Sequence, residues 1–180
     1  ETVSLGSKVY HTDANWQGPD TQSAIYKFAN GKTVTFDCYC NANWKNPEGI
    51  GTGAVVNCEH GAIFFHPKDA VYVYDEKGRQ IAEEADPSCD EWIQSTTGAS
   101  YLDTNHLTNF CDAIRRNDPD FCFSPVVTGC ASTMMAHTAN MAADTGLKVR
   151  LDGETGKLLN TEDELKKLWS REYEKGWEPA

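Results

Sequence analysis

The stretch NANWKNPEGIGTG, residues 41–53, has the composition of a ligand-binding loop. Side-chain amides and an aromatic ring bind sugars by hydrogen bonding and stacking, and a few well-placed polar groups fix the ligand's orientation. Its glycines lack the Gly-x-Gly-x-x-Gly and Gly-Lys-Ser/Thr patterns of phosphate-binding loops. We therefore predict that four of its residues contact a sugar-like small molecule: Asn41, Asn43, Trp44 and Lys45. The alternative is an ordinary long hairpin connection.

The turn NWQGPDTQ, residues 15–22, contains the same residue types and is a second, weaker candidate.

The histidines favour structural roles. His137 shares a helical stripe with three apolar side chains, Cys130, Met134 and Met141. No acidic residue lies three or four positions away to orient its ring, so we expect a hydrogen-bonded core histidine, with a ligand or base as the alternative. The spacing of His60 and His66 matches no known metal motif, and His106 is expected at the surface.

Seven cysteines cannot all pair internally, and no Cys-x-x-Cys occurs. Cys38 and Cys40 stand at strand spacing, which places both side chains on one face of a sheet. Metal ligation at this pair would need two more ligands, so we expect buried free thiols. No nucleophile and base stand in a recognisable arrangement. We therefore assign no catalytic, cofactor-binding or metal residue.

The elements that position these residues change along the chain. The first 80 residues have the alternation of strands, and Asn30-Gly31 between two β-prone runs predicts a hairpin. The run after this turn alternates an apolar face with a mixed one: Val34, Phe36, Cys38 and Cys40 against Thr33, Thr35, Asp37 and Tyr39. Such alternation is typical of an antiparallel sheet covered on one side.

Helices are expected after residue 100. HLTNFCDAIRRNDPDF, residues 106–121, has apolar residues at helical spacing and ends at Asn117-Asp118-Pro119, because proline disfavours the helical state in the residue before it. A second helix is predicted from Ser124-Pro125 to Gly146. Thr161 and Glu164 are expected to cap a last short helix.

The composition limits the possible partners. The 180 residues carry 27 acidic and 16 basic side chains, a formal net charge of −11. This sign opposes binding to nucleic acid and to anionic lipid, and no apolar run approaches the length of a membrane span. The hydrophobic content of 39% predicts a packed fold, most simply one domain over residues 1–180.

The second half of the chain resembles the C-terminal end of the glucose–fructose oxidoreductase/inositol dehydrogenase (Gfo/Idh/MocA) family, in a bacterial subgroup that ends in W-S-R-x-Y-x-x-G-W. The elements that carry the resemblance are His106, Asn109, Phe110, Asp112, Ile114 and Arg115; His137, Asn140 and Ala142; Asp152, Thr155 and Gly156; and Trp169, Ser170, Arg171, Tyr173, Gly176 and Trp177. In the first half, PDTQSAIYKFANGK and NCEHGAIFF resemble the family's hairpin and strand pair.

The resemblance implies a fold and a function. Family members begin with a Rossmann domain that holds NAD(P), and this chain contains none of its Gly-rich loop, so by itself it is expected to bind no cofactor. The expected fold is α+β, an open, largely antiparallel sheet with helices packed on one face. The expected function is that of the C-terminal substrate and oligomerisation domain of an NAD(P)-dependent oxidoreductase acting on a sugar or cyclitol.

Alternatives remain open at this point. Some relatives use the nicotinamide transiently to cleave glycosides, and a stand-alone carbohydrate-binding or assembly module is the alternative from another class. Unpaired cysteines favour a reducing compartment, but many bacterial relatives are exported, so cytoplasm and periplasm both stay open.

We also expect a homo-oligomer. The sheet face that carries Thr33, Thr35 and Tyr39 holds few charges, and residues 71–74 add tyrosines. A broad, weakly charged face left in water usually marks an interface, and second domains of the resembled family commonly meet through such sheets.

Overall fold

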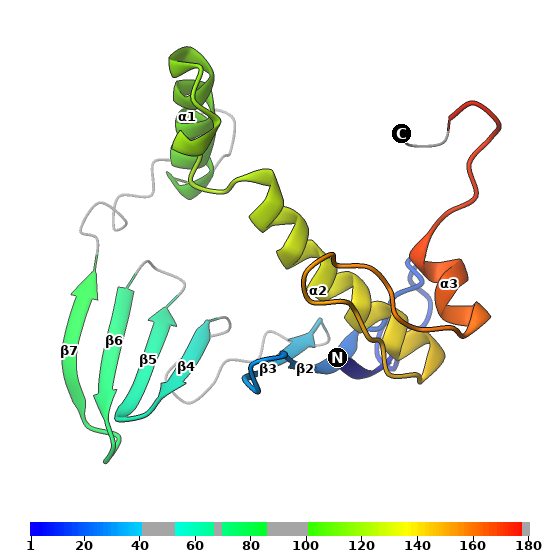
Figure 1. The fold of residues 1–180 in the computed structure, drawn as a ribbon. Helices are drawn as coiled ribbons and strands as arrows, with labels where there is room; N and C mark the ends of the chain where they lie inside the picture. The colour runs from blue at the N-terminus through cyan, green and yellow to red at the C-terminus, as the bar shows by residue number, and fades with distance from the viewer. Residues whose placement is uncertain (41–52, 67–69, 86–100, 178–180) are drawn as a thin grey trace. The chain divides into compact units, whose positions relative to one another are not determined.

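The computed structural model describes residues 1–40, 53–66, 70–85 and 101–177, the last range without the side chains of 101–103. The chain divides into two compact units, one formed by Glu1–Ala42 with Val126–Ala180 and the other by Asn43–Pro125 (Figure 1). Each unit is built on its own antiparallel sheet. The predicted α+β class with antiparallel strands is confirmed, with the strands divided between two sheets.

The first unit contains a three-stranded sheet in the order β1-β2-β3. The strands are β1 (Thr2–Ser7), β2 (Thr21–Lys27) and β3 (Thr33–Tyr39). The predicted hairpin joins β2 to β3, and Gly31 adopts a φ of 83° there, in the left-handed region that glycine enters at no steric cost.

Helix α2 (Val126–Thr145) covers one face of this sheet. Ala139 and Met135 of the helix pack against Ala24 and Tyr26 of β2. The small side chain of Ala139 lets the helix backbone approach the strands closely. The helix ends as predicted at Gly146, which has a φ of 69° and donates its N–H to the Ala142 carbonyl at 2.9 Å.

The chain after α2 returns to β1 and closes a small core. Val149 pairs with Thr2 in an antiparallel bridge, and Leu151 pairs with Leu158 across a turn. Helix α3 (Asp163–Trp169) then packs on α2. The fully buried members of this core are Met141, Ala142, Val149 and Leu165.

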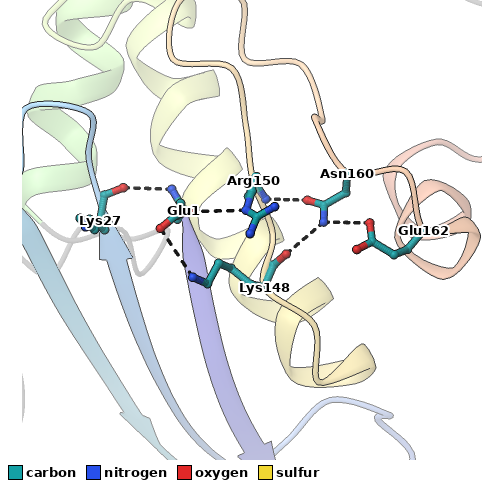
Figure 2. Close-up of polar contacts among 6 residues, drawn as sticks. All are labelled: Glu1, Lys27, Lys148, Arg150, Asn160 and Glu162. Carbon is teal, nitrogen blue, oxygen red and sulfur yellow. Dashed lines mark hydrogen bonds and ion pairs between the residues drawn. The ribbon is translucent and has the colours of Figure 1, made fainter.

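Polar contacts tie the same segment to the start of β1 (Figure 2). The Glu1 carboxylate lies 3.7 Å from the Lys148 ammonium and 3.4 Å from the Arg150 guanidinium. The Asn160 side chain accepts the Arg150 N–H at 2.6 Å and donates to the Lys148 carbonyl at 3.1 Å. Asn160 thereby orders the returning segment itself. Because the charged side chains are exposed, the two backbone bonds between Thr2 and Val149, at 2.8 and 2.9 Å, contribute more to the junction with β1 than the ion pairs do.

The second unit contains a four-stranded sheet in sequential order. Its strands are β4 (Ala54–Cys58), β5 (Gly61–His66), β6 (Ala70–Asp75) and β7 (Gln80–Ala85). The β4–β5 turn requires a glycine at position 61, because a Cβ there would lie 2.0 Å from the Tyr74 carbonyl oxygen.

Helix α1 (Tyr101–Arg116) belongs to the second unit and ends where the sequence predicts. Asn117 takes a φ of 51°, and Asp118 donates its N–H to the Ala113 carbonyl at 3.0 Å. A single 3₁₀ turn, η2 (Pro119–Phe121), follows. The buried Asn109 side chain donates to the Phe121 carbonyl at 3.0 Å and accepts the Phe123 N–H at 2.8 Å, which fixes this turn against the helix.

Two details differ from the sequence predictions. The apolar residues that stand at helical spacing on α1, Leu107, Phe110 and Ile114, are exposed and do not form a buried stripe. The N-cap of α3 is Glu162, whose side chain makes no capping bond, so the predicted Thr161 cap is wrong. In the described part of the chain, no helix has the length and apolar content to cross a bilayer.

Candidate binding site in the 8–20 loop

The first predicted site, Asn41, Asn43, Trp44 and Lys45, lies outside the described residues and stays a prediction. The second candidate, residues 15–22, covers the end of the 8–20 loop that joins β1 to β2 and the first two residues of β2.

The Asp20 carboxylate organises the loop. It is buried, with 1% of its surface exposed. It accepts the backbone N–H groups of Val9 at 3.0 Å, Tyr10 at 2.7 Å and His11 at 2.9 Å. Three consecutive N–H groups converging on one carboxylate form a backbone nest around an internal anion. The loop is therefore held closed by its own side chain.

The electrostatics of Asp20 follow from this arrangement. Burial alone would raise the pKa of the carboxyl, but the N–H groups of His11, Val9 and Tyr10 together outweigh burial and bring the pKa below its ordinary value. Asp20 is thus an anion at neutral pH, and its charge is satisfied within the loop. It holds the loop's shape and is not a free base.

Lys8 and His11 position the aromatic side chain of the loop. The Lys8 ammonium donates to the carbonyls of Ala14 at 2.6 Å and Trp16 at 2.7 Å and lies 5.2 Å from the centre of the Trp16 ring. The His11 ring centre is 5.3 Å from the Trp16 ring. Trp16 nevertheless remains 47% exposed. A fixed, half-exposed indole is a suitable surface for stacking against a ligand.

The loop also contacts Cys40, directly after the end of β3. Cys40 donates its N–H to the Asp20 carbonyl at 2.7 Å, and its own carbonyl accepts a bond from His11 Nε2 at 2.9 Å. The latter bond requires the proton on Nε2. The structure therefore joins the second candidate loop to Cys40, the residue that precedes the first candidate in the sequence.

This arrangement favours binding over catalysis. It presents Tyr10 and Trp16 to solvent on a backbone fixed by Asp20. Within the described residues, no three or more His, Cys, Asp or Glu side chains are grouped to hold a metal ion. The sequence pointed to residues 15–22 by residue type alone. Sequence reasoning missed Lys8 and His11, which lie at the other end of the same loop. Considering the polar residues at both ends of the loop together would have included them.

The histidine predictions are corrected in part. His137 is exposed, so the expected core histidine is wrong; its ring centre lies 6.4 Å from that of Trp169. His106 is exposed as expected. His60 lies 3.0 Å from the Glu76 carboxylate. His66 packs edge-on against Phe64 and Tyr72.

The expected burial of the cysteines is also wrong. Cys40, Cys58, Cys111 and Cys130 are exposed, and Cys38 and Cys122 are half-buried. These six are free thiols, as predicted.

Asp20→Asn is expected to loosen the loop. The asparagine side chain has one acceptor oxygen and no negative charge, so it holds the three backbone N–H groups less strongly than the carboxylate does. The backbone N–H groups of Val9, Tyr10 and His11 should therefore exchange hydrogen faster. Because the folded-state pKa is lowered, this stabilisation is present above the ordinary aspartate pKa, about 3.9, and is lost as the pH falls through the folded-state value. Hydrogen exchange followed by mass spectrometry tests both effects.

Asp13→Asn is the matched control, because Asp13 lies in the same loop but accepts only the exposed Thr12 hydroxyl. Equal acceleration of exchange in the two variants would contradict the anchoring role of Asp20.

Comparison with known proteins places the fold. No family model and no curated protein matches the sequence. Among solved structures, a proposed oxidoreductase from Thermotoga maritima matches with a TM-score of 0.54 and 16% identity over 81% of this chain. An oxidoreductase from Agrobacterium radiobacter, in complex with NAD⁺, L-tartaric acid and magnesium, matches with a TM-score of 0.53 and 13% identity over 81% of this chain.

The likeness shows a shared fold. The chain spans 38% of the length of the first oxidoreductase and 41% of the second, so most of each neighbour lies outside the matched part.

Proposed function

We propose that this chain is the C-terminal substrate and oligomerisation domain of an NAD(P)-dependent oxidoreductase that acts on a sugar or cyclitol. The observation that carries the proposal is the fold, which two oxidoreductases share over 81% of this chain, one of them crystallised with NAD⁺ and a small polyhydroxy acid. The order of motifs resembling the Gfo/Idh/MocA family supports the same conclusion. The parent enzyme's NAD(P) site is assigned to the part of the protein that this chain does not span.

The substrate contacts are assigned to residues 41–45, as the sequence predicts, with the 8–20 loop as a second, separate candidate. Asn41, Asn43, Trp44 and Lys45 supply amides, an indole and a charge, and Trp16 of the 8–20 loop supplies a second indole. An indole accompanied by amide or ammonium donors suits a polyhydroxylated ring, because C–H groups of the ring stack on the indole while its hydroxyls accept hydrogen bonds from the donors.

The oligomer contact is assigned to the face of the three-stranded sheet that α2 does not cover. The side chains exposed on this face include Val3, Leu5, Ile25, Thr33, Thr35 and Tyr39. Their positions alternate with those of Ala24 and Tyr26 under the helix, which fixes them to the opposite side. A face of this composition suits a second copy of the same sheet.

Trp44→Ala in the parent enzyme is expected to lower kcat/KM about fivefold, because a stacked aromatic contributes on the order of 1 kcal/mol. Steady-state assays that follow NAD(P)H absorbance with sugars and cyclitols measure this effect. Trp177→Ala, at an indole 78% exposed in the C-terminal tail, is the matched control and should leave kcat/KM unchanged.

His137→Ala should leave the activity unchanged, since the side chain is exposed. It should change the free energy of unfolding by no more than about 0.5 kcal/mol. If His137→Ala lowered kcat/KM and Trp44→Ala did not, the assignment of the substrate contact to Trp44 would be wrong. A parent enzyme that oxidises or reduces none of the polyols would contradict the proposed function.

A further inference from the structure

Two thiols stand together at the end of β3. Cys38 lies within the strand and Cys40 directly after it, so the two side chains are two positions apart and share a face. In its three-stranded sheet β3 is an edge strand, paired with β2. Cys38 is half-buried and Cys40 is exposed, and both are free. A reagent of modest size can therefore reach the pair from the open edge.

The backbone holds both cysteines in place before any ligand binds. Cys38 is in register with Gln22 of β2. Cys40 is fixed on both sides, through its N–H to the Asp20 carbonyl at 2.7 Å and through its carbonyl to His11 Nε2 at 2.9 Å. Fixed ligand atoms lose little conformational entropy on binding, which increases affinity.

The two thiols are close enough to interact. Burial, followed by a side-chain hydrogen bond with Cys40, raises the pKa of the Cys38 thiol. The protonated form of the Cys38 thiol, next to Cys40, is thereby favoured.

A direct disulfide fits this geometry poorly. Residues two apart in a strand are separated by about 6.6 Å at Cα, near the upper end of the range of about 4.4–6.8 Å that disulfides span. Side chains two positions apart in an extended chain also project in the same direction and not toward each other. One bridging atom between the sulfurs removes this strain.

We propose that Cys38 and Cys40 form a dithiol site for a soft, thiophilic ion that accepts two sulfur ligands, of the Cu(I) type. Thiolates select soft ions over hard ones. A structural zinc site would need two further protein ligands. Among the described residues no third His, Cys, Asp or Glu completes such a group. The inference stands independently of the proposed oxidoreductase function.

A trivalent arsenical probes the geometry of the site. Phenylarsine oxide reacts with two neighbouring thiols without redox change: two S–H bonds and the As–O bond break, two S–As bonds form, and the oxygen leaves with both protons as water. A single thiol forms no stable product in excess glutathione. Intact mass spectrometry of the full chain in excess glutathione should therefore show one adduct, removed by dithiothreitol.

Cysteine variants assign the adduct. Cys38→Ser and Cys40→Ser should each abolish it, whereas the controls Cys111→Ser and Cys130→Ser, at exposed thiols on helices α1 and α2, should retain it. Circular dichroism of each variant establishes that it is folded. An adduct that survives in both Cys38→Ser and Cys40→Ser would overturn the proposal.

The second arm uses Cu(I) itself. Anaerobic competition against bicinchoninate should show one Cu(I) bound per chain, with the affinity reduced at least tenfold in Cys38→Ser and in Cys40→Ser and unchanged in Cys111→Ser. Cu(I) affinity that does not depend on Cys38 and Cys40 would refute the site, even if the arsenical adduct forms there.

Discussion

Leu165→Ala is expected to lower the free energy of unfolding by about 2–5 kcal/mol. Leu165 is 0% exposed and packs in the core formed with Met141, Ala142 and Val149. Removing its side chain leaves a cavity between α3, α2 and the segment that bridges to β1. Helix α3 has seven residues, too few to be stable without tertiary packing, so its loss should follow.

Urea unfolding monitored by circular dichroism measures this effect. The matched control is Leu168→Ala on the same helix, where the side chain is 40% exposed and the expected cost is about 1 kcal/mol or less. Typical domains are stable by about 5–15 kcal/mol. The cost of Leu165→Ala is a large part of that stability, so the substitution should lower the urea concentration at the midpoint of unfolding strongly. Equal costs for the two variants would contradict the packing of α3 described above.

Tyr39→Glu is expected to dissociate the proposed oligomer while leaving the fold intact. Tyr39 is 58% exposed on the uncovered sheet face, and its hydroxyl lies 3.4 Å from the Asp37 carboxylate. A second carboxylate beside Asp37 would repel the first, and association would have to remove both charges from water. The fold should survive because the side chain is not part of the core.

Light scattering at high protein concentration measures the change in mass. Tyr173→Glu, at a tyrosine 44% exposed in the C-terminal segment, should leave the assembly unchanged. A species of 19.9 kDa before any substitution would show that the sheet face is not a self-association surface.

Local signals in the sequence predicted several elements correctly. Asn30-Gly31 gave the β2–β3 hairpin, because glycine supplies the positive φ of its turn. Asn117-Asp118-Pro119 ended α1 and Ser124-Pro125 preceded α2, since proline at these positions restricts the backbone on a scale of one or two residues.

Features that depend on distant partners were not predictable in the same way. Strand β7 has the sequence QIAEEA, whose alanine and glutamates favour helices, and its pairing with β6 decides its structure. His137 stands on an apolar stripe, but which side of α2 is covered depends on the sheet, and His137 is left exposed.

The candidate site shows the same limit. Residue type was sufficient to mark 15–22 as a candidate, because amides and an indole cluster there. The role of Asp20 required knowing that the backbone of residues 9–11 folds back onto it. Such a contact between the two ends of one loop has no periodicity that a sequence pattern could reveal.

The central proposal is most directly tested by calorimetric titration with NAD⁺ and NADP⁺, on this 180-residue chain and on the longer polypeptide that the proposal assigns as its parent enzyme. We predict saturable heat for the longer polypeptide and none for the chain alone, because the described residues show no Gly-rich strand–loop–helix unit of the kind that binds a dinucleotide. Saturable binding to the chain alone, tighter than about 1 mM or roughly −4 kcal/mol, would contradict the proposal, as would a longer polypeptide that binds neither cofactor.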